Sequence, residues 1–177
     1  MENNIFTKLY DWAEERTITQ QPHDKNGFVA NLVSELKEYI ESDYYGKVDS
    51  LCDTVVFCAT ELPKLGFSKE AMSEKYDDVV IKRITDYKTH EEVMIDFLGD
   101  IVDTEFTESK FDAIVGYCFS KLNYMGIDFE IAMEETFKEI DSRRGAWNDE
   151  VKKWKKFTDD EHKALWYSAD YSKAKRS

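Results

Sequence analysis

The sequence predicts an all-α protein built as a helical bundle. Apolar residues recur every three to four positions along most of the 177 residues, as in helices that bury one face. The chain contains 7 Gly and 2 Pro, too few for the many turns of a β-sandwich. No segment alternates apolar and polar residues for long enough to predict a strand. Helices are therefore expected throughout.

The first half of the chain predicts four helices. They are expected over residues 4–16, 27–41, 48–65 and from 68 onward. The first begins at Asn3 or Asn4, whose side chain can accept hydrogen bonds from free backbone amides. The third ends at Gly66, a residue that tolerates the left-handed conformation found at helix C-termini. This third helix is apolar on nearly every side, which is typical of a central, buried helix.

The second half predicts three further helices and a tail. The helices are expected to begin near Thr89, Thr107 and Asp128. Thr89 and Glu92 have the spacing of a capping box, and Gly126 is a natural stop before the third of these helices. The last 30 residues or so are basic and aromatic. One short helix is expected there, after the capping-box pair Thr158 and Glu161.

Two segments of the chain are similar to each other. Residues 47–72 and 110–133 both read Lys-x-Asp, an apolar helix, a glycine stop, a capping residue and then Ala-Met. The similarity predicts duplicated four-helix units, although the match needs a gap and chance stays an alternative. On this basis the single domain 1–177 divides into a first unit (1–88), a second, degenerate unit (89–145) and a basic, aromatic tail (146–177).

The charge balance limits the partners. The chain has 24 Lys and Arg against 37 Asp and Glu, a net charge of −13. Such a charge disfavours nucleic acid and anionic membranes as partners. No apolar run approaches the ~20 residues of a membrane span, and the N-terminus lacks the apolar stretch of a signal peptide. We expect a cytoplasmic protein without nucleic-acid or membrane partners; a homo-oligomer is compatible with the sequence.

Carboxylates on the second and third predicted helices carry the expected chemistry. Glu35 and Glu38 border the apolar stripe of their helix, and Asp49 and Asp53 share a face of the next, with Asp53 inside an apolar run. A buried carboxylate is costly unless it is paired or bound to metal. Helices joined by a short connection should bring the four acids to one cavity, a site suited to Mg²⁺ or Mn²⁺. The alternative is a solvated helix face.

The order of these motifs resembles a known family. The segments WAEERTI, NGFVANLVSELKEYIE and VDSLCDTVVFCATELPKLGF are similar to the all-α nucleoside triphosphate pyrophosphohydrolases, the superfamily of MazG and the dimeric dUTPases. The family carries E-x-x-E on one helix and E-x-x-D or D-x-x-x-D on the next, here Glu35 to Glu38 and Asp49 to Asp53. The C-terminal part resembles the tail of phage-encoded members described as phosphoribosyl-ATP pyrophosphohydrolase-like.

The resemblance implies an enzyme that hydrolyses nucleoside triphosphates to the monophosphate and pyrophosphate, with a role in nucleotide-pool control. It implies that one or two Mg²⁺ ions, or Mn²⁺, are held by four acids: Glu35, Glu38, Asp49 and Asp53. Glu38 is the expected acceptor of the proton from water, and Asn31 is expected to orient the nucleotide. Arg143 and Arg144 are expected to reach the triphosphate, the alternative being ordinary charges at a helix C-terminus.

Departures from the family pattern leave a second function open. Ser34 and Ser50 stand where the family often has Glu, and in the second unit Gly116 stands where a second acid would follow Asp112. These positions favour a non-catalytic helical protein that binds a nucleotide or a host protein. The four retained acids favour catalysis.

Overall fold

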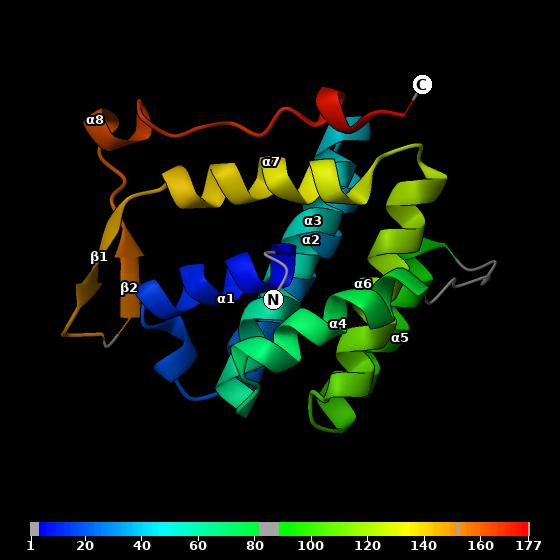
Figure 1. Ribbon diagram of the computed structural model, residues 1–177, viewed down its shortest axis with the longest axis horizontal. Coiled ribbons are helices and arrows are strands. Elements are labelled where there is room, and N and C mark those ends of the chain that lie inside the picture. Colours follow the sequence, from blue (N-terminus) through cyan, green and yellow to red (C-terminus); the bar gives the residue numbers. More distant parts are fainter. Residues whose placement is uncertain (1–3, 82–88, 152, 177) are drawn as a thin grey trace.

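The computed structural model describes residues 4–81, 89–151 and 153–176. These residues form eight α-helices, three short 3-10 helices and one two-stranded hairpin (Figure 1). The α-helices are α1 (Ile5–Glu15), α2 (Lys25–Glu41), α3 (Tyr44–Glu61), α4 (Lys69–Ile81), α5 (His90–Asp103), α6 (Glu108–Tyr124), α7 (Phe129–Ser142) and α8 (Asp160–Lys163). The other elements are η1 (Ile18–Gln20), η2 (Pro63–Leu65), η3 (Tyr171–Ala174), β1 (Gly145–Asn148) and β2 (Lys153–Lys156). The mostly helical class is thereby confirmed, and no helix in these ranges is long and apolar enough to cross a membrane.

Local signals place most helix ends where the sequence predicts them. Asn4 accepts hydrogen bonds from two backbone amides at the start of α1, and Thr89 with Glu92 forms the predicted capping box of α5. Asp128 caps α7 as Asn4 caps α1, by accepting hydrogen bonds from two backbone amides. Gly66 and Gly126 adopt positive φ angles of 94° and 74°. Gly126 follows the C-cap residue of α6, so this predicted stop is confirmed. Gly66 instead caps η2, because α3 itself ends at Glu61, just before Pro63, and not at residue 65 as predicted.

Two further predicted boundaries are wrong. The third helix begins earlier than expected, at Tyr44, because the side chain of Asp43 caps it through the backbone amide of Gly46. The short helix α8 is capped by Asp159 and not by Thr158, since the Asp159 carboxylate accepts the backbone N–H of His162. In both places the side chain of an aspartate provides the cap.

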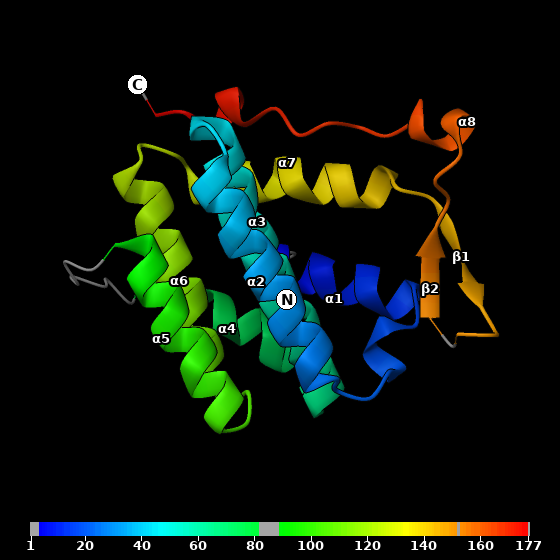
Figure 2. The same cartoon turned by 180° about the vertical axis from the view of Figure 1, so that it is seen from behind.

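The central element is α3. It packs against α1, α2, α6 and α7, and α2 makes its most extensive contact (Figure 2). Buried side chains are found around its whole circumference, among them Leu51, Cys52, Val55 and Ala59. The prediction of a central, buried helix is confirmed. From Val48 to Glu61 no residue of α3 is exposed, whereas Tyr44 and Tyr45 at its start are.

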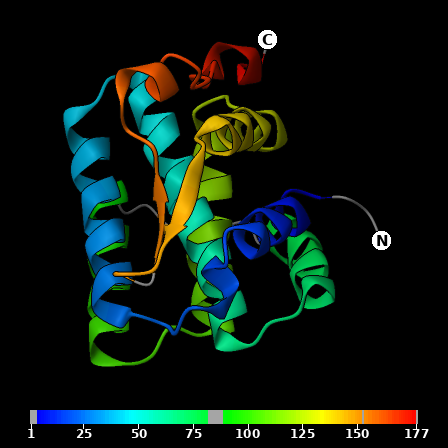
Figure 3. The ribbon, with the colours of Figure 1, turned by 90° about the vertical axis from the view of Figure 1, so that its left-hand side faces the viewer.

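The expectation of no strands is wrong for residues 145–148 and 153–156. β1 and β2 pair antiparallel, with Trp147 opposite Trp154, and the hairpin stands beside the end of α1 (Figure 3). Strands of four residues are too short for an alternating pattern to be recognised. The aromatic pair and the close cover of Gly145 by the Trp154 ring are visible only in the folded chain.

The hairpin depends on glycine at position 145. A Cβ added there would lie 2.3 Å from the backbone oxygen of Lys155 and 2.3 Å from the Trp154 ring. We expect Gly145→Ala to destabilise the protein by roughly 1–3 kcal/mol, the usual range for overpacking. Gly99→Ala is the matched control, because a Cβ on this helical glycine meets nothing within 4 Å. It should be neutral or stabilise by up to ~1 kcal/mol. Urea unfolding followed by tryptophan fluorescence measures both, and equal effects would contradict the close packing.

Candidate functional site

The four predicted acids lie where α2 and α3 run side by side. Glu35 is buried, with 8% of its surface exposed, while Asp49 and Asp53 are half-buried and Glu38 is exposed at the edge. The buried Ser50 ties the two helices at this level, because its hydroxyl donates to the backbone carbonyl of Glu35. We refer to the contact between α2 and α3 that carries Glu35, Glu38, Asp49 and Asp53 as the acidic groove.

The carboxylates of the acidic groove affect one another electrostatically. Burial raises the pKa of Glu35 to about 7, and the charges of Glu38 and Asp49 contribute to the rise. Burial, then the charges of Asp49 and Glu35, raise the pKa of Asp53 well above its ordinary value. Burial also raises the pKa of Asp49, although a hydrogen bond from Tyr171 opposes this rise. Their negative charges therefore repel one another in a poorly hydrated place.

Helix α7 adds an acid and a cation to this neighbourhood. Glu139 contributes to the raised pKa values of Asp49 and Asp53, and Arg143 opposes them. Arg143 is ion-paired with Glu139 one turn earlier on α7. The structure therefore brings Arg143 to the acidic groove, whereas the exposed Arg144 lines a separate cavity of about 280 Å³. Sequence reasoning missed Glu139, whose only signal is its spacing of four residues from Arg143.

The donor chemistry of the acidic groove fits a hard divalent cation. Carboxylate oxygens are the preferred ligands of Mg²⁺ and Mn²⁺, and negative charge exceeds positive charge among the groups that act on Asp49 and Asp53. Within the described ranges, no three His, Cys, Asp or Glu side chains are already arranged to hold a metal ion. A shared ion would therefore require these carboxylates to rotate toward one another.

A cavity of about 740 Å³ lies further along α2 and α3, and the four groove acids are not among its lining residues. Asn31 and Phe57 line it, and each lies one helical turn from a groove acid, Glu35 on α2 and Asp53 on α3. Aromatic rings form much of its wall, from Trp12, Phe28, Phe57 and, on the hairpin, Trp154. A cavity of this size and lining is typical of sites for small organic ligands.

Polar groups converge on the same cavity. His23 Nδ1 lies 2.6 Å from Glu61 Oε1, and Lys64 Nζ lies 2.9 Å from Glu61 Oε2. The other ring nitrogen of His23 and the indole nitrogen of Trp12 are buried and have no hydrogen-bond partner among the described residues. Such atoms are costly to bury unless a ligand or water satisfies them. The sequence offers no local signal for this group, because His23 and Glu61 are 38 positions apart.

Asp112, which the sequence places in a second unit, lies in a different setting. Its two carboxylate oxygens are each 3.4 Å from Lys75 Nζ, so α6 is ion-paired with α4. Glu108 forms a second ion pair with the same lysine. Asp112 therefore has a cation as its partner, in contrast to Glu35.

The raised pKa of Glu35 predicts a pH-dependent stability. Because the folded state binds this proton more tightly than the unfolded state, stability falls as pH rises from about 4.5 to about 7. In EDTA we expect Glu35→Gln to be more stable than wild type at pH 8, by at most about 3.5 kcal/mol at ~1.4 kcal/mol per pKa unit. The difference should vanish near pH 4.5. Urea unfolding across this range measures it, and parallel wild-type and variant curves would contradict a protonated Glu35.

Comparison with known protein families, with curated proteins and with solved structures finds no match. The nature of the site is therefore inferred from its own chemistry. Two features define it, an acidic groove between α2 and α3 and an aromatic cavity that continues along the same pair of helices.

Proposed function

We propose that the protein is a nucleoside triphosphate pyrophosphohydrolase that uses a divalent cation and releases a nucleoside monophosphate and pyrophosphate. The observation that carries the proposal is that Asn31 and Phe57, which line the aromatic cavity, each lie one helical turn from an acid of the acidic groove. An aromatic cavity of about 740 Å³ suits a nucleoside, and clustered carboxylates suit a cation that binds phosphate oxygens. The resemblance of the acidic motifs to the all-α pyrophosphohydrolases supports the same activity.

Each part of the substrate has a matching part of the site. The base would stack against Trp154 or Trp12, and the free nitrogens of Trp12 and His23 would meet its polar edge. Asn31 lies between the cavity and Glu35, where its amide would orient the sugar or the first phosphate. The phosphates would then extend along the acidic groove toward Arg143.

A bound Mg²⁺ ion would neutralise phosphate charge and lower the pKa of an attacking water. The ligands would be Glu35, Asp49 and Asp53 together with Glu38. Glu38 is exposed at the edge of the groove, which leaves it accessible to water as the predicted proton acceptor.

The fold is part of this proposal. We propose a MazG-like arrangement with two related units, 1–88 and 89–145. The equivalent positions of Gly66 and Gly126, each with positive φ and followed by a new helix, support the relation locally. Gly116 stands where the second unit would need the equivalent of Asp53, so the second unit is the degenerate one.

A non-catalytic nucleotide-binding protein is the second candidate. It is favoured by Ser50, which stands where the resemblance would place an acid and whose hydroxyl serves a backbone hydrogen bond between α2 and α3. Ser34, at the other departing position, is exposed. Incubation with each nucleoside triphosphate and Mg²⁺, followed by measurement of pyrophosphate, separates the candidates. The second candidate would be favoured if an α,β-methylene nucleotide analogue binds in calorimetry while no nucleoside triphosphate releases pyrophosphate.

Asp53→Asn should abolish turnover while the fold remains intact or becomes more stable, because the amide removes a charge from an acid-rich, poorly hydrated place. We expect at least a ~100-fold loss, since altering a partner outside the ligand set already costs 10–100-fold. Asp112→Asn is the matched control on α6, and its activity per folded molecule should stay within about 2-fold. Pyrophosphate release under saturating Mg²⁺ measures both. Comparable losses would mean that the two units both act in the reaction.

Trp154→Ala should weaken nucleotide binding, because loss of one base-stacking ring costs ~1–3 kcal/mol, or roughly 5–150-fold in affinity. Trp147→Ala is the control, since Trp147 is the cross-strand partner of Trp154 but does not line the cavity. Titration calorimetry with the α,β-methylene analogue measures both affinities. If both variants bind as tightly as wild type, the cavity does not hold the base.

A further inference from the structure

The C-terminal segment follows α7 in the opposite direction (Figure 1). Its contacts with α7 and with the turn before it are spread along the segment, from Tyr167 to Arg176. The backbone amides of Tyr167 and Ala169 bind Ser142 and Glu139 near the end of α7, and the carbonyl of Ala174 accepts the amide of Asp128 near its start. The segment is thus held as a strap across one side of the bundle.

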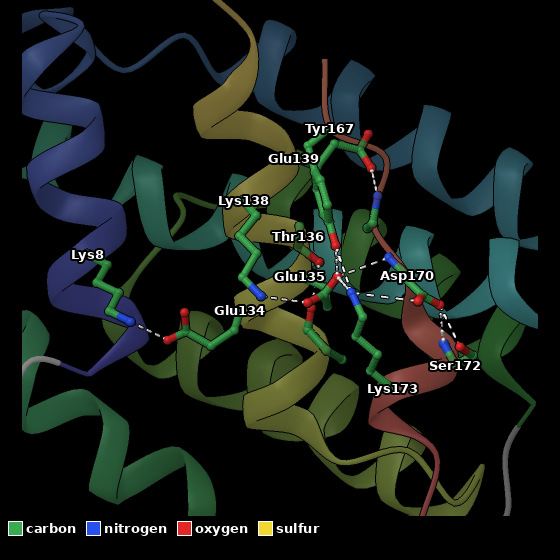
Figure 4. A network of polar contacts seen from close by, with 12 residues as sticks. Lys8, Glu134, Glu135, Thr136, Lys138, Glu139, Tyr167, Asp170, Ser172 and Lys173 are labelled. Carbon is green, nitrogen blue, oxygen red and sulfur yellow. Dashed lines mark hydrogen bonds and ion pairs between the residues drawn. The ribbon is translucent and has the colours of Figure 1, made fainter. Parts of the chain in front are cut away.

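Glu135 is the main anchor of this strap (Figure 4). Only 2% of its surface is exposed. Its carboxylate accepts hydrogen bonds from Lys138 Nζ at 2.6 Å, Lys173 Nζ at 3.1 Å, the backbone amide of Asp170 at 3.2 Å and the hydroxyl of Tyr167. Burial alone would raise the pKa of Glu135, but these donors together lower it to about 2. Glu135 is therefore ionised at neutral pH, and both of its carboxylate oxygens accept hydrogen bonds.

The strap delivers Tyr171 to the acidic groove. Tyr171 lies in η3 and is buried, and its hydroxyl donates to Asp49 Oδ1 at 2.5 Å. The hydroxyl of Thr136, on α7, lies 2.9 Å from the Tyr171 oxygen on its other side. Tyr171 and Asp49 are 122 residues apart, so only the anchored strap brings them together.

We propose that the C-terminal strap, residues 167–174, is a functional part of the acidic groove in which Tyr171 is a positioning residue that holds Asp49 for a divalent cation. The inference rests on the cation required by the proposed function. A carboxylate among like charges tends to swing toward water, and a hydrogen bond to one oxygen fixes its rotamer while the second oxygen stays available to an ion.

The choice of donor supports a positioning role. A lysine or arginine at this place would neutralise Asp49, as Lys138 and Lys173 neutralise Glu135. A tyrosine hydroxyl carries no charge, so it orients Asp49 and leaves its negative charge for the cation. Two neighbouring residues of the strap therefore have different effects. Lys173 neutralises Glu135, which anchors the strap, whereas Tyr171 orients Asp49 and leaves it charged as a ligand.

Mn²⁺ alone, titrated calorimetrically without nucleotide, tests the proposal. Tyr171→Phe should weaken Mn²⁺ binding by ~10–100-fold, the usual effect of losing a hydrogen-bond partner of a ligand. Tyr124→Phe, a tyrosine 87% exposed on α6, is the matched control and should bind as wild type does. In an Asp49→Asn background, Tyr171→Phe should have no further effect on Mn²⁺ affinity, because its role passes through Asp49. A merely structural tyrosine would weaken binding equally in both backgrounds.

The anchor gives a second test. Lys173→Met removes an exposed donor to Glu135, and Glu135→Gln removes the carboxylate itself. Both should weaken Mn²⁺ binding in an otherwise folded protein, verified by circular dichroism, and neither effect should add to that of Tyr171→Phe. Unchanged or tighter binding in Tyr171→Phe, with Mn²⁺ bound by wild type, overturns the strap proposal alone. Absence of Mn²⁺ binding in wild type overturns the proposed function and the strap proposal with it.

Discussion

The enclosure of α3 by its neighbours is the constraint on which the site depends. A helix that is covered by α1, α2, α6 and α7 cannot turn a carboxylate freely to bulk water. Asp49 and Asp53 lie on this helix and face further acids on α2 and α7, so their ionised forms are disfavoured. The folded chain therefore holds unfavourable charge at one place, which is a common property of functional sites.

Two buried glutamates show how donors decide the state of a carboxylate. Glu35 and Glu135 are both almost fully buried. Glu135 is surrounded by two ammonium groups, a hydroxyl and a backbone amide, and its pKa falls to about 2. Glu35 has carboxylates as its electrostatic neighbours, and its pKa rises to about 7. Burial acts in the same direction on both, so the difference comes from the groups placed around them. Glu135 holds the strap, while Glu35 has no such donors among the described residues and is suited to bind a cation.

The molecule assembles this site from distant parts of the chain. α2 and α3 supply the acidic groove, and α1, η1 and the hairpin complete the aromatic cavity through Trp12, Ile18 and Trp154. α7 and the C-terminal strap close the other end through Arg143 and Tyr171. The basic, aromatic tail of the sequence is therefore split in two by the fold, with the hairpin beside the cavity and the strap beside the acids. The net charge of the chain does not predict this division, because the division depends on which residues contact one another in the folded chain.

The sequence by itself determined the elements whose signals are local. Helical periodicity, the capping box of Thr89 and Glu92, and the glycine stops at 66 and 126 all act within a few residues, so the helices could be predicted. The acid motifs on α2 and α3 could be placed together because a short connection makes these helices neighbours. Only the tertiary structure decided the hairpin, the His23–Glu61 pair, the anchor at Glu135 and the contact of Tyr171 with Asp49. Their partners are far apart in the chain, and the free energy that joins them comes from burial and hydrogen bonds that form after the helices have packed.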